Sequence, residues 1–350
     1  MRLAFVFPGQ GSQTVGMGKD IFEQFPAAKQ VFASADAALG FPLSSVCFEG
    51  PEETLKDTVH AQPAITAVSL AYLAAFLSEA GAGADAVFTG IPEAFRPTVT
   101  AGHSVGEYTA FIASGAIAFQ DGMRMVYRRG ELMSQDSKSC PSGMSAVLGL
   151  GRDALIEICR QAEEVVAQNA DTLKYASVNA GAGAVRVAND NAPGQIVISG
   201  AMPALEKAME LAQSAGAKRV VPLAVSGAFH SPVMAAAAQK FTEFAASVQI
   251  YDAHTPVVSN CEAEPMYTAA EIRKEAERQI VSSVLWTQSV EWMAGKGQAD
   301  TFVEFGAGQV LGGLIKRTVK NCAIYSVGSA QDVVRVAAAL REQGYGSVGQ

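Results

Sequence analysis

Cysteine is scarce in this chain, and the spacing of the few cysteines excludes two common structural devices. Five cysteines are spread over 350 residues, and no CxxC pair occurs. A disulfide framework needs an even set at short spacings, and a zinc site needs closely paired thiols or imidazoles. We therefore expect neither a disulfide-rich fold nor a metal site, and we predict reduced thiols in the core.

Charge is also sparse. Only 17% of the residues are charged, the net charge is -8, and no run of Lys and Arg is longer than two residues. Proteins that bind nucleic acid as their main partner have basic clusters or stripes. The sequence therefore argues against a nucleic-acid partner.

Long hydrophobic runs are missing as well. The apolar start Leu3–Phe7 is interrupted by Pro8 and Gly9, whereas a secretory signal needs about 7–15 apolar residues. The longest uncharged apolar run is Ala64–Leu77, which is shorter than the roughly 20 residues that span a bilayer. We expect a cytoplasmic protein without a membrane segment, and a buried helix at that run.

The composition that remains is that of a folded protein with a large interior. Hydrophobic residues make up 49% of the 350 positions. A chain of this length can bury one large core, or one core together with a smaller inserted domain.

The N-terminal part alternates short apolar strands with helical periodicity, as in an α/β sheet with its chemistry at the strand ends. We expect a strand at Leu3–Phe7, helices at Asp20–Leu39 and Ala61–Ala80, a surface loop at residues 81–98, a strand at Thr98–Ala101 and then a long alanine-rich helix.

A second unit is expected to begin near Cys140, because the next elements follow the order β-α-β-β-α-β of a split βαβ fold. Its elements are predicted at Met144–Leu150, Arg152–Gln168, Val185–Ala188, Gln195–Ser199, Pro203–Gly216 and Arg219–Ala224. The chain then returns to the larger unit, with a helix at Glu262–Gln279 and a strand at Phe302–Phe305. The predicted domains are residues 1–140 with 225–350, and residues 141–224.

The segment from Gly102 to Gly106 fits the pattern G-x-S-x-G. Small flanking residues let the backbone bend sharply, so Ser104 would sit on a turn between strand and helix with its hydroxyl exposed. The N–H groups at the start of the following helix favour developing negative charge. The alternative is a glycine-bounded turn with an incidental serine.

A serine nucleophile needs a base, and the chain has only four histidines. His103 adjoins Ser104, and on a tight turn its side chain should point elsewhere. His230 lies in a loop between Gly227 and Pro232, directly after a predicted strand. A loop held by a rigid scaffold is a typical place for a catalytic group. We therefore predict His230 as the base.

Two further features fit a carbonyl substrate with a free carboxylate. The turn after the first strand contains Gly9, Gln10 and Gly11, and one of its N–H groups could complement that of Val105 in an oxyanion hole. Arg129 lies about 100° from the centre of an apolar stripe on its predicted helix, at 3.6 residues per turn. It can therefore lean inward and bind a carboxylate with two hydrogen bonds.

With these residues identified, the chain resembles the malonyl-CoA:acyl-carrier-protein transacylases of bacterial type II fatty-acid synthesis over nearly its whole length. The motifs that carry the resemblance are Phe5–Gln13, Ala101–Tyr108, Arg129-Gly130, Asn191–Gly200, Ala228–Pro232 and Gly306–Arg317.

The resemblance implies an α/β-hydrolase-like large domain with an inserted ferredoxin-like small domain. It implies that malonyl-CoA and acyl carrier protein are the partners, that no cofactor is needed, and that the protein is a monomer. The implied roles are a nucleophile at Ser104, its base at His230, a main-chain carbonyl at Gln279 that orients the histidine, an oxyanion hole from Gln10 and Val105, a carboxylate clamp at Arg129, and pocket residues at His103 and Asn191.

Some parts of the chain depart from the family or need a local explanation. Residues 88–97 and 165–186 look like extra loop sequence relative to compact members. An acidic carrier protein would be repelled by the net charge of -8, so docking needs a local basic patch. Lys316, Arg317 and Lys320 are candidates, although such a cluster can equally be a solvated helix face.

Three rival functions stay open at this point. A serine hydrolase of this fold has the order Ser…Asp/Glu…His, which acidic residues between Ser104 and His230 permit. The second is a transacylase for methylmalonyl or another polyketide extender. Against it, the triplet Ala228-Phe229-His230 resembles that of malonyl-selective members, in which bulk beside the histidine leaves little room for an α-methyl group. The third is a silent carrier-binding module, which an intact Ser104 and His230 disfavour.

Overall fold

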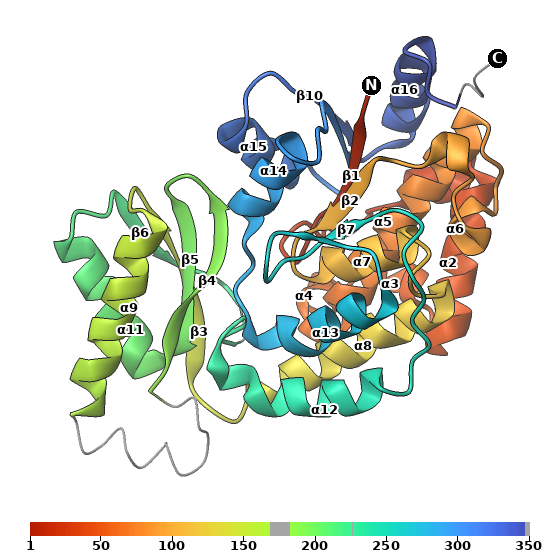
Figure 1. The fold of residues 1–350 in the computed structure, drawn as a ribbon. Helices are drawn as coiled ribbons and strands as arrows, with labels where there is room; N and C mark the ends of the chain where they lie inside the picture. Colours follow the sequence, from red (N-terminus) through yellow and green to blue (C-terminus); the bar gives the residue numbers. More distant parts are fainter. Residues whose placement is uncertain (169–182, 226, 347–350) are drawn as a thin grey trace.

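Two β-sheets organise the protein, which we describe from a computed structural model covering residues 1–168, 183–225 and 227–346. The larger sheet has six strands in the order β10-β9-β1-β2-β7-β8, and all neighbouring pairs are parallel except β7–β8 (Figure 1). Its strands are β1 (Leu3–Phe7), β2 (Val99–Gly102), β7 (Val257–Val258), β8 (Pro265–Met266), β9 (Thr301–Phe305) and β10 (Ala323–Val327).

Helices cover both faces of this sheet, so its central strand β1 is buried along its whole length. Leu3, Phe5 and Phe7 belong to one core cluster, whereas Ala4 and Val6 belong to another on the opposite face. This is the period-2 alternation of a strand that is buried on both sides.

The first core cluster lies under the helices of the N-terminal half, with α12, α13 and α16 alongside. These helices are α1 (Lys19–Gln24), α2 (Pro26–Leu39), α3 (Leu43–Glu49), α4 (Glu52–Lys56), α5 (Thr58–Ala80), α6 (Ala86–Thr89), α7 (Val105–Ala113), α8 (Phe119–Asp136), α12 (Ala235–Ala245), α13 (Ala269–Arg278) and α16 (Ala330–Glu342). The second cluster lies under α14 (Trp286–Ala294) and α15 (Val310–Thr318). Short 3₁₀ turns occur at η1 (Glu93–Phe95), η2 (Pro232–Met234) and η3 (Gln279–Val281).

The smaller sheet is antiparallel and is built from one continuous stretch of chain. Its strand order is β4-β5-β3-β6, with helices inserted in the order β-α-β-β-α-β, as the sequence predicts. The elements are β3 (Ser142–Leu148), α9 (Arg152–Ala167), β4 (Val185–Ala192), β5 (Gln195–Ala201), α11 (Met202–Ser214) and β6 (Arg219–Pro222).

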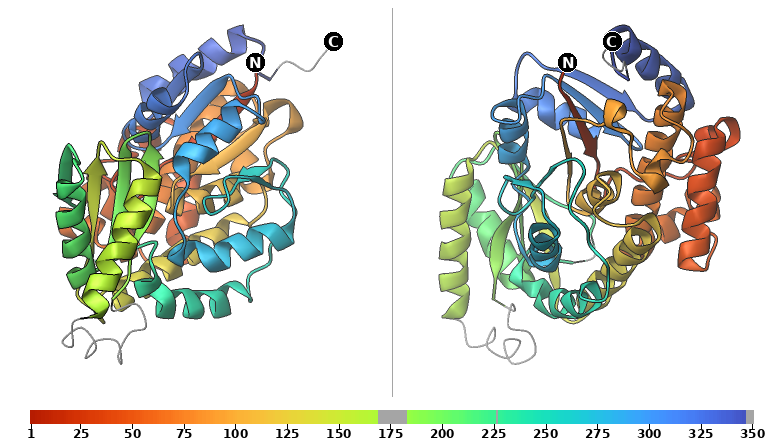
Figure 2. Two further views of the ribbon diagram at one scale, coloured as in Figure 1. Left: turned by 60° about the vertical axis from the view of Figure 1, so that its left-hand side comes forward. Right: turned by 45° about the vertical axis from the view of Figure 1, so that its right-hand side comes forward.

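The two faces of the smaller sheet have different neighbours. Val147, Ile196 and Ile198 pack against α9 and α11, which cover the face turned away from the larger sheet (Figure 1). Met144 and Val197 alternate with them and face the rest of the protein. The N-terminus lies at the opposite end of the molecule, near α16 (Figure 2).

Several predicted elements need correction. The helix expected at Asp20–Leu39 is two helices, because Pro26 disfavours helical backbone at Phe25, which is extended with φ -118° and ψ 116°. The long helix after Ser104 ends at Ala113, and Gly115 follows with φ 78°. The loop at residues 81–98 contains α6 and η1.

Two more predicted helices, one in the second half of the chain and one in the core, differ from those observed. The helix expected from Glu262 begins only at Ala269, after the two-residue strand β8. The apolar run Ala64–Leu77 lies within α5, a helix of 23 residues, so the predicted buried helix is confirmed but is longer than the run itself. By length and composition α5 could cross a bilayer, but it is buried inside the protein as a core helix.

All five cysteines are free thiols. Among the described residues, no group of three or more His, Cys, Asp and Glu side chains could hold a metal ion. Residues 169–182, most of the second predicted extra loop, lie outside the described residues.

Candidate active site

The parallel pairing of β1 with β2 brings two predicted turns together at the carboxyl edge of the larger sheet. Phe7 pairs with Gly102, and the N–H of His103 donates to the carbonyl of Phe7 at 3.0 Å. A Cβ on Gly9 would lie 2.5 Å from the carbonyl oxygen of His103, so only glycine permits this approach. The turns that contain Gln10 and Ser104 therefore lie against each other.

Ser104 occupies a strained turn between β2 and α7. Its backbone has φ 54° and ψ -113°, which is rare for a residue with a side chain. Such a conformation costs about 1–3 kcal/mol and persists only when the surroundings impose it. The turn exposes the Ser104 hydroxyl to a cavity of about 390 Å³.

His230 meets this hydroxyl from a loop 126 residues further along the chain. Its Nε2 lies 2.7 Å from Ser104 Oγ. Its Nδ1 lies 3.0 Å from the carbonyl oxygens of both Gln279 and Ser282. Because carbonyls only accept, Nδ1 carries the proton and donates it, which leaves the lone pair of Nε2 directed at the serine.

Electrostatics keep this imidazole neutral. Burial, assisted by the positive charge of Arg129, lowers the pKa of His230 to about 3. At neutral pH the side chain is therefore able to accept a proton from Ser104.

Arg129, on α8, also lies beside the hydroxyl of Ser104. It is buried, and its Nη2 lies 3.4 Å from Ser104 Oγ. Nη1 donates to Gln62 Oε1 and Nη2 to Gln279 Oε1, each at 2.8 Å. Both partners are neutral amides, so no carboxylate neutralises the guanidinium through these bonds. The neighbouring Arg128 instead pairs with Glu131 nearer the surface.

The other predicted residues line the cavity or border it. Gln10, Val105, His103 and Asn191 are among its lining residues. His103 Nε2 lies 2.7 Å from Asn191 Oδ1, so the imidazole points to the smaller sheet rather than to the nucleophile. Gln279 contributes its carbonyl to His230. The structure thus gathers the other seven predicted residues around Ser104.

Residues from both units line the cavity. The larger unit supplies Ser104 and His230, and the smaller sheet supplies Met144 from β3, Asn189 from β4 and Val197 from β5. A ligand in the cavity would therefore touch both units.

Several polar residues of the site were missed by sequence reasoning. Asn260 and Glu107 hold the backbone around Ser104, Gln62 holds Arg129, and Ser282 supplies a second carbonyl to His230. The side chain of Gln279 also donates to the carbonyl of Ser104 at 2.8 Å. Only Glu107, which directly follows the motif, had a positional signal.

One family of known proteins matches nearly the whole chain. The model of the acyl transferase domain family matches residues 4–343. The chain belongs to the acyl transferase family.

Relatives of this acyl transferase match it end to end. The malonyl CoA-acyl carrier protein transacylase of Bacillus subtilis (strain 168) is 39% identical over 342 residues, which is 98% of each chain. The protein of the same name from Haemophilus influenzae is 37% identical over 93% of this chain and 95% of its own.

Solved structures agree with the acyl transferase fold. The acyl-carrier-protein-S-malonyltransferase from Bartonella henselae has a TM-score of 0.85 at 36% identity and covers 98% of this chain and 100% of its own. A malonyl-transacylase in complex with its type II PKS acyl-carrier protein has a TM-score of 0.84 at 33% identity and covers 97% of this chain and 100% of its own.

Proposed function

We propose that this acyl transferase moves a malonyl group from malonyl-CoA to the phosphopantetheine thiol of an acyl carrier protein, through a malonyl ester on Ser104. The observation that carries the proposal is the position of the Ser104 hydroxyl, 2.7 Å from a neutral imidazole and 3.4 Å from a buried guanidinium. The first group suits acyl transfer, and the second suits an acyl group that ends in a carboxylate. The names of the relatives support the same substrates.

In the first half-reaction, Nε2 of His230 removes the proton of Ser104 as its Oγ attacks the thioester carbonyl. The N–H groups of Val105 and Gln10 are proposed to stabilise the oxyanion. Val105 is the first residue of α7, so its N–H has no acceptor within the helix. When the tetrahedral intermediate collapses, the carbon–sulfur bond breaks and the imidazolium returns its proton to the CoA sulfur.

The carboxylate of the malonyl group is proposed to bind Arg129. Arginine presents parallel N–H donors that match a carboxylate. The amides of Gln62 and Gln279 fix the plane of the guanidinium without cancelling its charge. His103 and Asn191 are proposed to border the bound acyl group.

In the second half-reaction the thiol of the carrier attacks the malonyl-serine ester. His230 takes the thiol proton and delivers it to Ser104 Oγ as the ester bond breaks. The two half-reactions exchange one thiol for another at the same carbonyl. The proposed chemistry therefore needs no cofactor beyond the two substrates.

The site favours transfer over the rival functions. Hydrolases of this fold orient the histidine with a carboxylate, whereas Nδ1 of His230 is directed at two main-chain carbonyls. Phe229 lines the cavity beside His230, which supports a malonyl rather than a methylmalonyl donor. A silent binding module would have no need for a serine and a neutral histidine at hydrogen-bonding distance.

We also propose the wider setting of the enzyme. The six-stranded unit, residues 1–140 and 225–350, would be an α/β-hydrolase-like domain, and residues 141–224 an inserted ferredoxin-like domain. The strand order β4-β5-β3-β6 supports the second assignment. A cytoplasmic monomer that serves fatty-acid synthesis fits the resemblance described above.

A direct test is to incubate the protein with malonyl-CoA and a phosphopantetheinylated carrier and to measure malonyl-carrier and free malonate. We expect malonyl-carrier to form much faster than malonate. Release of malonate at the same rate with and without carrier would instead identify a hydrolase.

A further inference from the structure

The backbone of Ser104 is strained, so other contacts must hold it in this conformation. Among the residues that the structure describes, Ser104 is one of five other than glycine with positive φ, and the strain lies at the residue that presents the hydroxyl. Its own side chain does not cap α7. The restraint must therefore come from other residues that bind the peptide groups of the turn.

Asn260 binds the turn on both sides. Its Oδ1 accepts the N–H of Ser104 at 2.8 Å, and its Nδ2 donates to the carbonyl of Gly102 at 2.7 Å. A single buried carboxamide thus bridges two main-chain groups that flank His103. The orientation of the amide is fixed, because an N–H can only donate and a carbonyl can only accept.

Asn260 is itself held in place by its main chain. It follows β7, the strand next to β2, and its carbonyl accepts the N–H of Leu285 at 2.8 Å. Its N–H donates to Glu107 Oε1 at 2.7 Å. Glu107 is buried in the first turn of α7, three residues after Ser104.

Glu107 closes a circuit of hydrogen bonds around the nucleophile. Its other oxygen, Oε2, accepts from Gln279 Nε2 at 2.6 Å, and the same nitrogen lies 2.8 Å from the carbonyl of Ser104. Both peptide groups of Ser104 are therefore bound by side chains, Asn260 on one side and Gln279 on the other. Glu107 joins the main-chain N–H of Asn260 to the side chain of Gln279.

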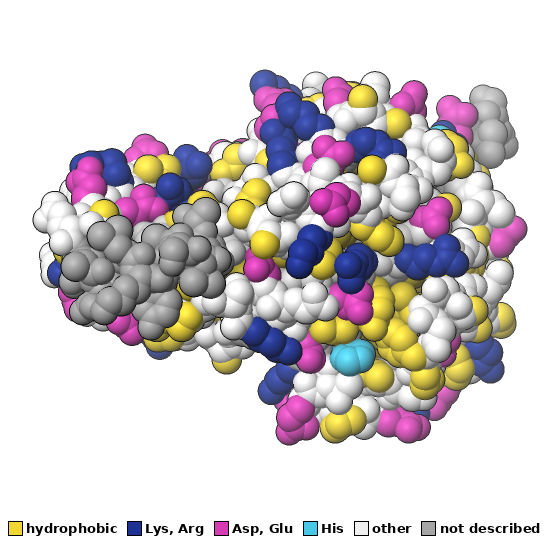
Figure 3. Space-filling model, turned by 90° about the horizontal axis from the view of Figure 1, so that it is seen from below, with side chains coloured by type: hydrophobic (Ala, Val, Ile, Leu, Met, Phe, Trp, Pro, Cys, Tyr) yellow, Lys and Arg dark blue, Asp and Glu magenta, His cyan; other side chains and the backbone are white. Residues whose placement is uncertain are grey.

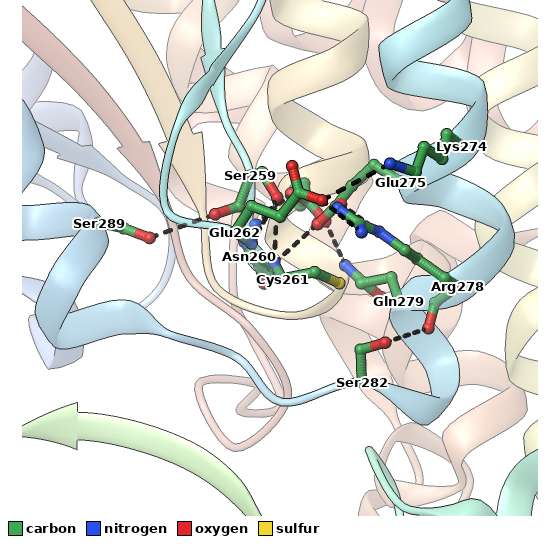
Figure 4. A network of polar contacts seen from close by, with 11 residues as sticks. Ser259, Asn260, Cys261, Glu262, Lys274, Glu275, Arg278, Gln279, Ser282 and Ser289 are labelled. Carbon is green, nitrogen blue, oxygen red and sulfur yellow. Dashed lines mark hydrogen bonds and ion pairs between the residues drawn. The ribbon is translucent and has the colours of Figure 1, made fainter.

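Behind this circuit lies a further layer of polar contacts, shown in Figure 4. Glu275 accepts the N–H of Cys261 at 2.8 Å and pairs with Arg278, which also reaches Glu262 at 2.6 Å. These contacts tie the loop that contains Asn260 to α13. Asn260 is thereby positioned from both its own main chain and its neighbours.

We propose that Asn260 is a positioning residue that holds the turn of Ser104 in its reactive conformation, with Glu107 fixing Asn260. The inference rests on the proposed role of Ser104 as nucleophile. Asn260 touches no reacting atom; it acts by keeping Ser104 Oγ within reach of His230. Small displacements of reacting groups are costly, since about 1 Å can reduce a rate on the order of 10²-fold.

The chemistry of the amide supplies a specific test. Asparagine can donate and accept at once, whereas an ionised carboxylate can only accept. A protonated carboxyl group regains the donor. In Asn260→Asp, the bond to the Gly102 carbonyl should therefore be present when the new carboxyl is protonated and absent when it is ionised. The ionisable groups around this network are Glu107 on α7, Arg129 on α8, Glu275 and Arg278 on α13, Cys261 and Glu262 in the loop of Asn260, and His103 and His230 beside Ser104.

The experiment measures two rates for the wild type, Asn260→Ala and Asn260→Asp: malonyl transfer, and covalent labelling of Ser104 by phenylmethanesulfonyl fluoride between pH 5 and 9. For Asn260→Ala we expect kcat and the labelling rate to fall on the order of 10²-fold, with KM for malonyl-CoA changed less than about threefold. For Asn260→Asp we expect a loss relative to wild type that deepens as the pH rises.

Glu304→Gln is the matched control for stability. Glu304 is a buried carboxylate that accepts two main-chain N–H groups, from Leu311 and Gly312, and it lies outside the cavity lining. This variant should lower Tm but leave the labelling rate within about twofold of wild type. If Asn260→Ala does not fold, the pH dependence of the isosteric Asn260→Asp decides alone.

Three results would overturn the proposal: a labelling rate of Asn260→Ala within threefold of wild type, an Asn260→Asp loss that is the same at every pH, or an effect on KM alone. Labelling by the sulfonyl fluoride requires no malonyl group. A wild type that is labelled at Ser104 but transfers no malonyl would contradict the proposed function while leaving the positioning role measurable.

Discussion

At the scale of single residues, the surroundings of His230 decide whether its imidazole is protonated. The imidazole is buried beside the positive Arg129, and both features disfavour a second proton. The main-chain carbonyls of Gln279 and Ser282 fix its tautomer. The side chain is thus a permanently available acceptor rather than a group that titrates near neutrality.

This argument predicts an unusual pH profile. Because the pKa of His230 is lowered to about 3, the imidazole is already neutral at pH 5. We expect kcat/KM for malonyl-CoA to stay level from pH 8 down to pH 5. A base with the ordinary pKa of about 6.5 would instead lose activity about tenfold for each pH unit below that value. A fall of kcat/KM centred near pH 6.5 would show that burial and Arg129 do not lower the pKa of His230.

The role of Arg129 predicts a change of donor selectivity. Arg129→Ala should reduce kcat/KM for malonyl-CoA on the order of 10²-fold, because a buried charge-assisted contact is lost. The rate with acetyl-CoA, which has no carboxylate, should change far less. Arg128→Ala is the matched control, since Arg128 pairs with Glu131 and does not line the cavity. Equal losses for both donors would rule out the carboxylate clamp.

The site could be predicted only where its signal is local in sequence. Ser104 lies in a five-residue motif and His230 in a glycine- and proline-bounded loop, so both are visible in the chain itself. Asn260 and Gln62 have no such motif, because they reach the site only through pairing of β7 with β2 and packing of α5 on α8. Their contacts exist only in three dimensions.

At the scale of elements, seven strands were predicted near their observed positions, whereas β7, β8 and β10 were not predicted. All four strands of the smaller sheet and β1, β2 and β9 lie within a few residues of their predicted positions. Helices were misjudged where local chemistry overrides periodicity. The clearest case is α13, where Thr268 and Glu271 form a capping box that starts the helix seven residues later than predicted.

Close packing between α7 and β1 leaves no room for a side chain at Gly106. A Cβ on Gly106 in α7 would lie 2.2 Å from the carbonyl oxygen of Phe7 at the end of β1. Gly106→Ala should therefore push α7 away from the sheet, destabilise the protein by about 1–3 kcal/mol and lower activity with it.

The control is Gly313→Ala, an exposed position of α15 where an added methyl group would meet no atom within 4 Å beyond its chain neighbours and the backbone of its own helix. It should be neutral or stabilising by up to about 1 kcal/mol. Urea unfolding of both variants provides the measurement. A Gly106→Ala protein as stable and active as wild type would show that α7 is not held this tightly against β1.

At the scale of the whole molecule, the cavity depends on how the two sheets are held together. Arg317 at the end of α15 bonds to Gln195 and to the carbonyl of Pro193 in the turn between β4 and β5. It therefore links the two units, a role that its place in a basic cluster did not indicate. Figure 3 shows one face on which basic and acidic side chains are interspersed.

The predicted docking of an acidic carrier on the basic cluster can be tested by substituting its two lysines, Lys316 and Lys320, which are exposed. Lys316→Glu with Lys320→Glu should raise KM for the carrier several-fold at low salt, and added salt should reduce the difference. KM for malonyl-CoA should stay unchanged. Lys19→Glu with Lys240→Glu, at exposed positions of α1 and α12, is the control with the same change of net charge. An unchanged KM for the carrier in the double variant would place docking elsewhere.

The central claim is that Ser104 forms a covalent bond to the malonyl group. The most direct test is mass spectrometry of the intact protein after mixing with malonyl-CoA in the absence of carrier, followed by peptide mapping. We predict a single malonyl addition on Ser104 in the wild type and none in Ser104→Ala. An adduct that persists in Ser104→Ala, or that maps to another residue, would contradict the account.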